Sequence, residues 1–526
     1  MALKTFAAIS IGSAVTEMKI FEFTSRRVMK EVDWISTRLG LGLDAYTMGR
    51  ISSRNVEELC RVLRDFARIM DGYKVNAYRA CATSAFRESR NMLILLDYIE
   101  KQTGLTIEVL SNSEQRFIDY QSIASVTTEF ESIIQNPAAI VDIGGSSMQV
   151  SLFDKDKLIT TQNIRVGSIT TREKLTPLEK NSLHFEKMLR EIVDHELAGF
   201  NKLFQKDRQI RNLIVVGGNL LEVIRPTEKG NKKFASISGD NFQKLYERVT
   251  VMRPEEIAAE FSLPQDAAAE GATAMVLCKV LMENFGVDTV WLPGFSLSDG
   301  LAYHYGVKKH YIQNGHNFDE DILAAARTIS KRYKCSQSHV KNLENNALQI
   351  FDKMKKIHGM DSRERLLLQI AVVLHNCGKF ISLEDVSECA FHIIMATEII
   401  GLSHSEREMI AYTVRFNTSP FLYYREFTQE ADISKEDYLT IAKITAILRL
   451  ANAMDRTHKQ KCQDVSMTLK DRELKITVTS QEDLSLELEP SGKKRNSSRK
   501  CSTYTRRSNR KKAFDERSIS DGVDRF

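Results

Sequence analysis

The residues best suited to chemistry lie in one stretch, residues 138–154, which reads AAIVDIGGSSMQVSLFD. An apolar run leads to Asp142 and then to a glycine-serine turn, after which apolar and polar residues alternate again, a pattern that predicts strand, tight turn and strand. The turn consists of Gly144, Gly145, Ser146 and Ser147. Adjacent glycines lack Cβ atoms, so consecutive backbone N–H groups can converge on an anion such as phosphate. Asp142 would repel a phosphate unless a divalent cation or a water lay between them, so the loop predicts phosphate together with magnesium.

A second copy of this pattern lies near the N-terminus. Residues 9–21, ISIGSAVTEMKIF, align without gaps with residues 141–153, so that Gly12 falls on Gly144 and Ser13 on Gly145. One glycine pair in a hairpin is usually only a turn, but a duplicated one predicts two similar lobes that face each other over a cleft. The predicted fold class is α/β, and the arrangement resembles the duplicated lobes of the actin, hexokinase and Hsp70 superfamily (ribonuclease H-like). That fold narrows the chemistry to phosphoryl groups without choosing the reaction.

Two further segments carry side chains suited to phosphate chemistry. In residues 83–91, TSAFRESRN, hydroxyl groups and Arg87 stand where a strand runs into a helix, which is a good place for an anion. In residues 111–123, SNSEQRFIDYQSI, Glu114 and Arg116 stand at the start of the next helix. Each segment has an alternative interpretation, because helix caps with surface charge are common and a first-turn Glu often only complements the helix dipole.

Length and composition exclude several classes of protein. At 526 residues and 42% hydrophobic content, the chain is long enough for three domains and a tail. No apolar run approaches a membrane span and the first residues read as a strand, so we expect a soluble, cytoplasmic protein without a membrane partner. The eight cysteines are scattered without a CxxC pair or zinc-like spacing, which favours small core residues in a reducing compartment.

The positive net charge belongs to the C-terminal tail. The formal charge is +5, but residues 493–526 carry twelve Lys+Arg and four Asp+Glu, a net +8, which leaves −3 for residues 1–492. Such a segment cannot bury a core, so we expect it to be disordered, and solvated rather than bound to nucleic acid.

Pattern changes along the chain predict the domain boundaries. Residues 313–460 are patterned almost entirely as helix, and residues 465–478 and 484–490 alternate like a pair of strands. The expected domains are a first lobe at 1–128, a second lobe at 129–308, a helical domain at 312–462, a small β segment at 463–490 and a basic tail at 491–526.

The order of the motifs resembles one phosphatase family. IGS, ATSAFRESRN, SEQRFI and DIGGSS occur in this order, at residues 11–13, 82–91, 113–118 and 142–147. They are similar to DIGSNS, ATSALRDAxN, EEARLI and DIGGGSTE of the exopolyphosphatase and guanosine pentaphosphate phosphatase family (Ppx/GppA). NLIVVGGNL at 212–220 resembles the family's third glycine loop, and the helical region resembles its HD-type domain. Several ordered motifs are far harder to obtain by chance than one glycine pair.

The resemblance implies a hydrolase that releases terminal phosphate from inorganic polyphosphate, as an exopolyphosphatase does, or from guanosine pentaphosphate (pppGpp). It implies Mg²⁺ or Mn²⁺ as cofactor and a homodimer, since family members are often dimers. Glu114 would be the general base that activates water, Arg87 a clamp on the phosphate chain, and Asp142 the metal ligand. The phosphates would lie on the three glycine loops, at Gly12, Ser13, Gly144, Gly145, Ser146, Ser147, Gly217, Gly218 and Asn219.

The chain departs from the family at two acidic positions near the metal. The first-loop Asp is Ser10 and the Glu of STE is Gln149, so the affinity for a cation should fall. Glu114, Arg87 and Asp142 are retained, which favours a working hydrolase.

The HD-type metal site is also degenerate. Asn376 stands where the family has the Asp of the HD pair, and Met395 takes the place of the second His of an HxxH motif. An amide cannot replace a bridging carboxylate, and a thioether is a poor ligand for hard cations. The histidines of this region are therefore expected to pack or hydrogen-bond inside the helical domain without a catalytic metal; they are His339, His375 and His392.

Two other functions remain open from the sequence. A catalytically weak protein that senses polyphosphate or an alarmone without turnover would explain the replacements at Ser10 and Gln149. A kinase or Hsp70-like ATPase of the same superfamily is less favoured, because no segment resembles an adenosine pocket.

Overall fold

The computed structural model describes most of the chain. The described residues are 4–24, 28–124, 127–155, 157–179, 185–205, 208–217, 220, 223–224, 234–313, 316–462, 464–470, 473–487 and 511–514. The chain divides into two compact units, Met1–Asp321 and Ile322–Phe526. Among the described residues, no helix is both long enough and apolar enough to cross a membrane.

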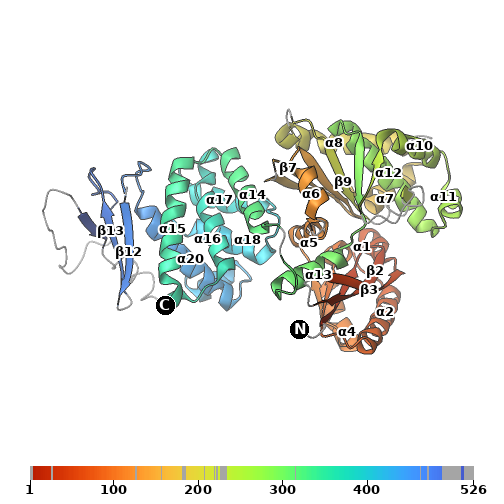
Figure 1. The fold of residues 1–526 in the computed structure, drawn as a ribbon, viewed down its shortest axis with the longest axis horizontal. Coiled ribbons are helices and arrows are strands. Elements are labelled where there is room, and N and C mark those ends of the chain that lie inside the picture. Colours follow the sequence, from red (N-terminus) through yellow and green to blue (C-terminus); the bar gives the residue numbers. More distant parts are fainter. Residues whose placement is uncertain are drawn as a thin grey trace. The chain divides into compact units, whose positions relative to one another are not determined.

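The first lobe of the N-terminal unit is built on a mixed sheet with strand order β3-β2-β1-β4-β5 (Figure 1). The central strand β1 is buried on both faces, which explains its nearly continuous apolar run, and it pairs antiparallel with β2 and parallel with β4. The elements are β1 Lys4–Ile11, β2 Val15–Phe23, β3 Met29–Arg38, α1 Leu41–Met48, α2 Ser53–Gly72, β4 Ala77–Ala82, α3 Ser84–Arg87, α4 Met92–Thr103 and β5 Ile107–Val109.

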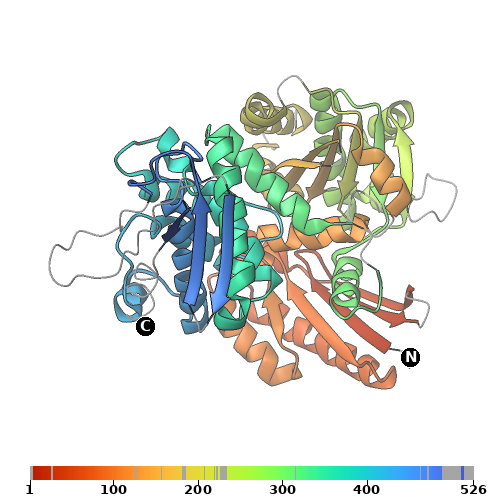
Figure 2. The ribbon, with the colours of Figure 1, turned by 60° about the vertical axis from the view of Figure 1, so that its left-hand side comes forward.

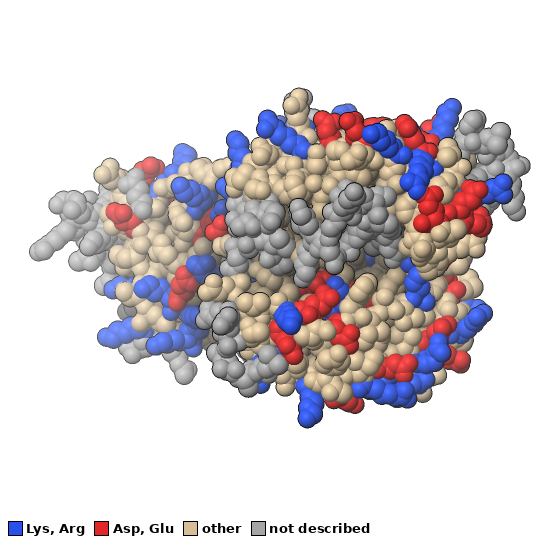
Figure 3. Space-filling view, turned by 45° about the vertical axis from the view of Figure 1, so that its right-hand side comes forward, with Lys and Arg blue, Asp and Glu red and all other residues tan. Residues whose placement is uncertain are grey.

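Helix α2 shows how the sequence selects the buried face in this lobe. Val56, Leu59, Leu63 and Phe66 recur at helical spacing and are all buried, and Ser52 caps the helix by accepting a hydrogen bond from the Asn55 N–H. Its outer face carries ion pairs, including Arg61–Glu58 and Arg68–Asp65. Basic and acidic side chains are likewise interspersed on the described part of the face shown in Figure 3.

The second lobe repeats the pairing of the first in a sheet of order β10-β11-β9-β6-β7-β8. Strand β6 is antiparallel to β7 and parallel to β9, as β1 is to β2 and β4, so the predicted duplication is present in the strand topology. The elements are α6 Thr127–Ile134, β6 Ala138–Ile143, β7 Met148–Asp154, β8 Lys157–Ile164, α7 Ser168–Glu179, α8 Phe185–Phe200, the π-helix η1 Asn201–Gln205, β9 Asn212–Val216, β10 Phe234–Ser238, α10 Gly239–Thr250, α11 Pro254–Phe261, α12 Gln265–Phe285 and β11 Thr289–Pro293.

Helix α13, Leu297–Lys308, returns to the first lobe after the second lobe is complete. Its residues Leu297, Leu301 and Ala302 share a core with the first sheet and with Ile118 of helix α5, Asn112–Ala124. The sequence prediction assigns this helix to the second lobe, at 129–308, whereas the structure packs it on the first. The reason is that an apolar stripe predicts burial but does not identify the surface that buries it.

The C-terminal unit is a bundle of helices followed by a small sheet of order β12-β13-β14 (Figures 1 and 2). The helical prediction for this region is confirmed. The elements are α14 Phe318–Arg332, α15 Gln337–His358, α16 Ser362–Leu374, the 3₁₀-helix η3 Cys377–Phe380, α17 Val386–Ala396, α18 His404–Arg415, α19 Tyr424–Glu430, α20 Lys435–Ala453, β12 Asp464–Lys470, β13 Glu473–Thr479 and β14 Lys511–Phe514.

The strand pair predicted at 465–478 and 484–490 is wrong in its pairing. Strands β12 and β13 together cover the first of these segments and pair with each other, whereas residues 485–487 form a turn. The Asp483 carboxylate accepts hydrogen bonds from the backbone N–H and the hydroxyl of Ser485, a local arrangement that competes with a strand. Within the predicted basic tail, Lys511–Phe514 pairs antiparallel with β13, and its other residues lie outside the described part of the chain.

Gly300 tests the packing of α13 against α5. A Cβ at this position would overlap the backbone oxygen of Ile118, so Gly300→Ala should destabilise the N-terminal unit by about 1–3 kcal/mol. The matched control is Gly199→Ala in α8, where a Cβ would meet nothing within 4 Å and should stabilise by up to about 1 kcal/mol. Urea denaturation of the full chain measures both, and equal stability of the two variants would contradict this packing.

Candidate active site

The two glycine turns have the same backbone geometry. The Gly12 N–H donates to the Val15 carbonyl at 2.9 Å, and the Gly144 N–H donates to the Ser147 carbonyl at 3.0 Å. The turns also lie close to each other, because a Cβ on Gly145 would be only 3.4 Å from the Ser13 Cβ. The predicted loops of the two lobes therefore meet at one place.

Helix α7 holds the second loop in a conformation suited to anions. The Ser168 N–H donates to the Gly144 carbonyl at 2.9 Å, and the Ile169 N–H donates to the Gly145 carbonyl at 3.0 Å. Gly167 permits this approach, since a Cβ there would overlap the Gly145 carbonyl group. With the carbonyls turned toward α7, the backbone N–H groups that follow have no hydrogen-bond partner among the described residues; they belong to Gly145, Ser146 and Ser147. Such N–H groups can bind phosphate oxygens.

A cluster of hydroxyl groups joins the first loop to the other segments. The Ser13 Oγ lies 2.5 Å from the Tyr46 Oη and 3.0 Å from the Ser84 Oγ, and the phenol lies 2.9 Å from the Ser84 Oγ. The Tyr46 hydroxyl also interacts with Ser146 of the second loop, and burial raises the pKa of Tyr46. Sequence reasoning missed Tyr46, because a tyrosine on α1 has no distinctive spacing from the loops.

Glu114 caps helix α5 in this conformation. Its Oε2 accepts hydrogen bonds from the Ser111 N–H at 3.0 Å and the Ser111 Oγ at 2.7 Å, while the Glu114 N–H donates to that Oγ at 3.2 Å. This is a reciprocal capping box. Glu114 therefore also stabilises the start of its helix, as the alternative interpretation of a first-turn Glu expects. Its Oε1 has no hydrogen-bond partner among the described residues and can still receive a proton from water.

Arg87 lies at the same corner as Glu114. The Arg87 Nη1 donates to the carbonyl of Leu110 at 2.5 Å, directly before the Ser111 cap. The structure therefore brings together the predicted base and the predicted phosphate clamp, although they come from different helices.

Helix α5 also reaches the second lobe beside Asp142. The Gln115 Nε2 donates to Asp142 at 3.4 Å, and the Arg116 Nε donates to the Gln149 Oε1 at 2.6 Å. Asp142 and Gln149 are direct partners across β6 and β7. Burial raises the pKa of Asp142 to about 6, although the Arg116 guanidinium opposes this rise.

Asp119 is a buried carboxylate that the sequence analysis did not single out. It lines a cavity of about 10 Å³ together with Arg116, Asp142 and Gln149. Burial and the neighbouring Asp142 raise the pKa of Asp119 well above its usual value. Its position one helical turn after Arg116 was a usable signal, since residues at i and i+3 share a helix face.

The third glycine loop is described only at its first residue. Gly217 has φ +142°, and a Cβ there would be 2.9 Å from the carbonyl oxygen of Ile143, so glycine suits the position. Gly218 and Asn219 lie outside the described residues.

Comparison with known proteins decides the family. The model of the Ppx/GppA phosphatase family matches residues 28–308, and the model of Ppx/GppA phosphatase domain III matches residues 323–490. The chain belongs to the Ppx/GppA phosphatase family. The expected family and the expected fold class are thereby confirmed.

The similar proteins are distant relatives. A guanosine-5'-triphosphate,3'-diphosphate pyrophosphatase of Photobacterium profundum is 20% identical over 489 residues, which are 90% of this chain and 91% of that protein. The structure of an exopolyphosphatase from Cytophaga hutchinsonii is 18% identical, with a TM-score of 0.50, and covers 59% of this chain and 99% of its own. An exopolyphosphatase-like protein is 20% identical, with a TM-score of 0.52, and covers 59% of this chain and all of its own. At these identities the solved structures show the fold alone.

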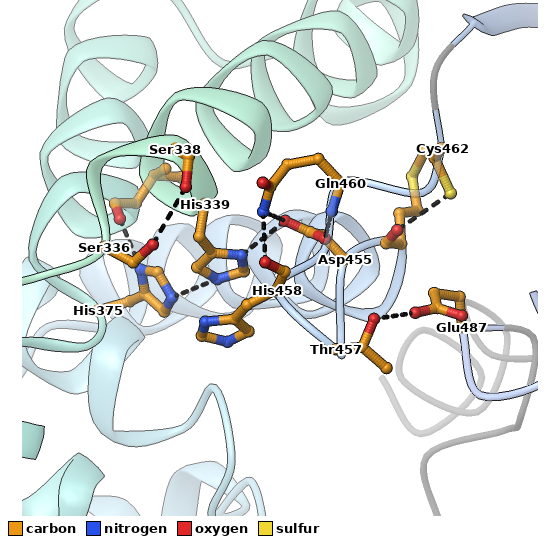
Figure 4. A network of polar contacts seen from close by, with 12 residues as sticks. Ser336, Ser338, His339, His375, Asp455, Thr457, His458, Gln460, Cys462 and Glu487 are labelled. Carbon is orange, nitrogen blue, oxygen red and sulfur yellow. Dashed lines mark hydrogen bonds and ion pairs between the residues drawn. The ribbon is translucent and has the colours of Figure 1, made fainter. Parts of the chain in front are cut away.

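Domain III of this Ppx/GppA protein contains a buried histidine network (Figure 4). The His339 Nδ1 lies 2.8 Å from Asp455, its Nε2 lies 3.2 Å from the His375 Nε2, and its ring stacks on His458. The His375 Nδ1 lies 2.7 Å from the Val372 carbonyl and must donate to it, because a carbonyl only accepts.

Burial and hydrogen bonds shift the pKa values of the groups on either side of His339. Burial lowers the pKa of His375 to about 3, so its ring is neutral and its Nε2 accepts from His339. The Nδ1 of the same ring lies 2.8 Å from Asp455, so His339 is held between His375 and this carboxylate. Burial opposes ionisation of Asp455, but hydrogen bonds from His339 and Gln460 hold its pKa below the usual value.

These contacts do not fit an HD-type metal site. The two facing imidazole nitrogens already bond to each other, Asn376 offers no carboxylate, and His392 is exposed on α17. The expectation that His392 lies inside the domain is therefore wrong, since the helix turns this residue outward next to Phe391. Among the described residues, no group of three or more His, Cys, Asp or Glu side chains is arranged to hold a metal ion.

The buried His375 makes domain III sensitive to acid. Its pKa is about 3 in the fold against 6.5 in the unfolded chain, so its contribution to stability is complete above pH 6.5. As the pH falls from 6.5 toward 3, protonation of His375 should lower the free energy of unfolding by about 1.4 kcal/mol per pH unit, and His458, whose pKa burial lowers to about 4, adds to this loss. Hydrogen exchange of α15 and α16 in the full chain at pH 7, 6 and 5 measures this slope.

Two variants identify the source of the acid sensitivity. His375→Gln should reduce the slope, whereas His404→Gln, on an exposed histidine of α18, should leave it unchanged. A slope of the same size in His375→Gln and in the parent protein would show that another group takes up the proton.

Proposed function

We propose that this protein hydrolyses phosphoanhydrides and releases terminal phosphate from inorganic polyphosphate or guanosine pentaphosphate. The observation that carries the proposal is the meeting of two equivalent glycine turns beside the corner that contains Glu114 and Arg87. The pyrophosphatase and exopolyphosphatase names of the similar proteins support the same reaction class.

Each group has a distinct part in the proposed reaction. The free Oε1 of Glu114 orients a water molecule and takes its proton as the water attacks the terminal phosphorus. The N–H groups of the second loop, fixed by α7 before substrate arrives, stabilise charge on the transferred phosphoryl oxygens. Arg87, which is anchored at Leu110, clamps the phosphate chain.

The residues around Asp142 fit a divalent cation such as Mg²⁺ or Mn²⁺. Carboxylate and amide oxygens are the ligands these ions prefer, and the Gln115 Oε1 beside Asp142 is a buried acceptor without a hydrogen-bond partner among the described residues. A bound cation would neutralise part of the phosphate charge. Asp142 is the proposed ligand, while Ser10 and Gln149 offer no charge.

Location and assembly remain predictions from the sequence. The seven cysteines in the described part of the chain are unpaired thiols, which suits the proposed cytoplasmic location. The proposed homodimer rests on the family resemblance.

Replacement of Glu114 by Gln tests the assignment of the base. Glu114→Gln keeps the size of the side chain and one acceptor for the Ser111 cap, but it cannot take a proton. Phosphate release from long-chain polyphosphate and from pppGpp, with Mg²⁺ or Mn²⁺, should fall by at least about 100-fold, while binding of the phosphate chain persists.

The control is Glu364→Gln, which alters an equivalent capping box at the start of α16. This variant should retain hydrolysis, because its cap is not part of the proposed site. Near-full activity of Glu114→Gln would contradict the assignment of the base. Binding without turnover by the unmodified protein would instead support the sensor.

A further inference from the structure

The cavity lined by Gln149 contains another carboxylate besides Asp142. Gln149 on β7 stands where the family motif has Glu, so this wall of the site has lost a negative charge. Asp119 on α5 lines the same cavity as Gln149, with Arg116 and Asp142. These four side chains come from both lobes of the N-terminal unit.

The cavity is lined by buried polar side chains together with apolar ones, among them Ile140, Phe153 and Val216. The exposed fractions of Arg116, Asp119 and Gln149 are 4%, 7% and 4%. The volume of about 10 Å³ is close to what one water-sized body needs. Because the polar side chains here are deeply buried, their charges are poorly screened by solvent and must be balanced locally.

The charges on these side chains do not balance when both carboxylates are ionised. Asp119 and Asp142 then carry two negative charges, and Arg116 supplies one positive charge. The Arg116 Nε donates to the neutral Gln149 amide. The positive charge of the guanidinium therefore acts mainly on the two aspartates. The Gln115 Nε2 donates to Asp142, while the buried Gln115 Oε1 has no hydrogen-bond partner among the described residues. A cation in the cavity would balance the charge.

We propose that Asp119 replaces the glutamate that the family carries at position 149. In this proposal, which rests on the proposed function, Asp119 and Asp142 together supply the negative charge that holds the divalent cation. The second carboxylate is thus delivered from helix α5 of the first lobe instead of strand β7 of the second. Gln149 keeps Arg116 in place by accepting from its Nε.

An exchange of the two side chains tests the proposal. Three variants of the full chain are compared with the parent protein: Asp119→Asn, Gln149→Glu, and the double variant Asp119→Asn/Gln149→Glu. The dissociation constant for Mn²⁺ without substrate is measured by electron paramagnetic resonance, with Mg²⁺ as competitor, and thermal unfolding confirms that each variant is folded.

Asp119→Asn should weaken Mn²⁺ binding by about 10-fold or more, a loss of the size seen when groups that support a metal site are removed. The double variant should recover most of this affinity, because it returns the carboxylate to position 149. Gln149→Glu alone should bind Mn²⁺ no more weakly than the parent protein. Unchanged affinity in Asp119→Asn, or a double variant as weak as this single one, would overturn the proposal.

The matched control is Asp321→Asn, which removes another buried carboxylate of the same unit. Asp321 is 4% exposed and accepts a hydrogen bond from Tyr120, but it does not line the cavity. The Mn²⁺ affinity of Asp321→Asn should equal that of the parent protein. An equal loss of affinity in Asp321→Asn and Asp119→Asn would show that Asp119 supports the fold and does not hold the cation. Phosphate release is assayed separately, so a parent protein that binds Mn²⁺ through Asp119 without hydrolysis would overturn the proposed function alone.

Discussion

The arrangement of the N-terminal unit depends on helix α5, which packs against the first lobe and forms hydrogen bonds to the second. Its apolar side, at Ile118, packs against α13, while the polar side chains of its first turns bond to the second sheet. The Arg116–Gln149 hydrogen bond is the shortest of these links at 2.6 Å, and both side chains are buried. Losing one partner would leave a buried polar group without its bond, which costs far more than a surface contact. The placement of Glu114 relative to the second loop follows from this link.

The second loop is held by a different set of contacts. Its carbonyls accept hydrogen bonds from the first turn of α7. Gly167 permits the close approach to the Gly145 carbonyl, which any side chain at position 167 would block. The N–H groups of Gly145, Ser146 and Ser147, which have no hydrogen-bond partner among the described residues, therefore point away from α7, so little reorganisation is needed to receive a ligand. The first loop instead depends on the hydroxyl cluster around Tyr46.

Local patterns in the sequence predicted the parts of the site that are local in the fold. The glycine turns, their duplication and the helix start at Glu114 are each contained within a few residues, and the structure reproduces them. The sequence did not predict the roles of Asp119 and Tyr46, because these roles depend on side chains from other helices and strands. The same limit explains the misassignment of α13 and the exposed His392, since a single sequence indicates which residues are apolar but not which surface covers them.

The return of α13 to the first sheet makes the first lobe discontinuous in the chain. The core of the first lobe contains Phe6, Phe21 and Phe23. Their packing partners Leu297 and Leu301 lie more than 270 residues later in the chain. During synthesis on the ribosome, the first lobe would emerge with part of its core uncovered, while the whole second lobe is still being made. The second lobe is thus an insertion that can fold early, and the first lobe closes only when the last helix of the unit has left the exit tunnel.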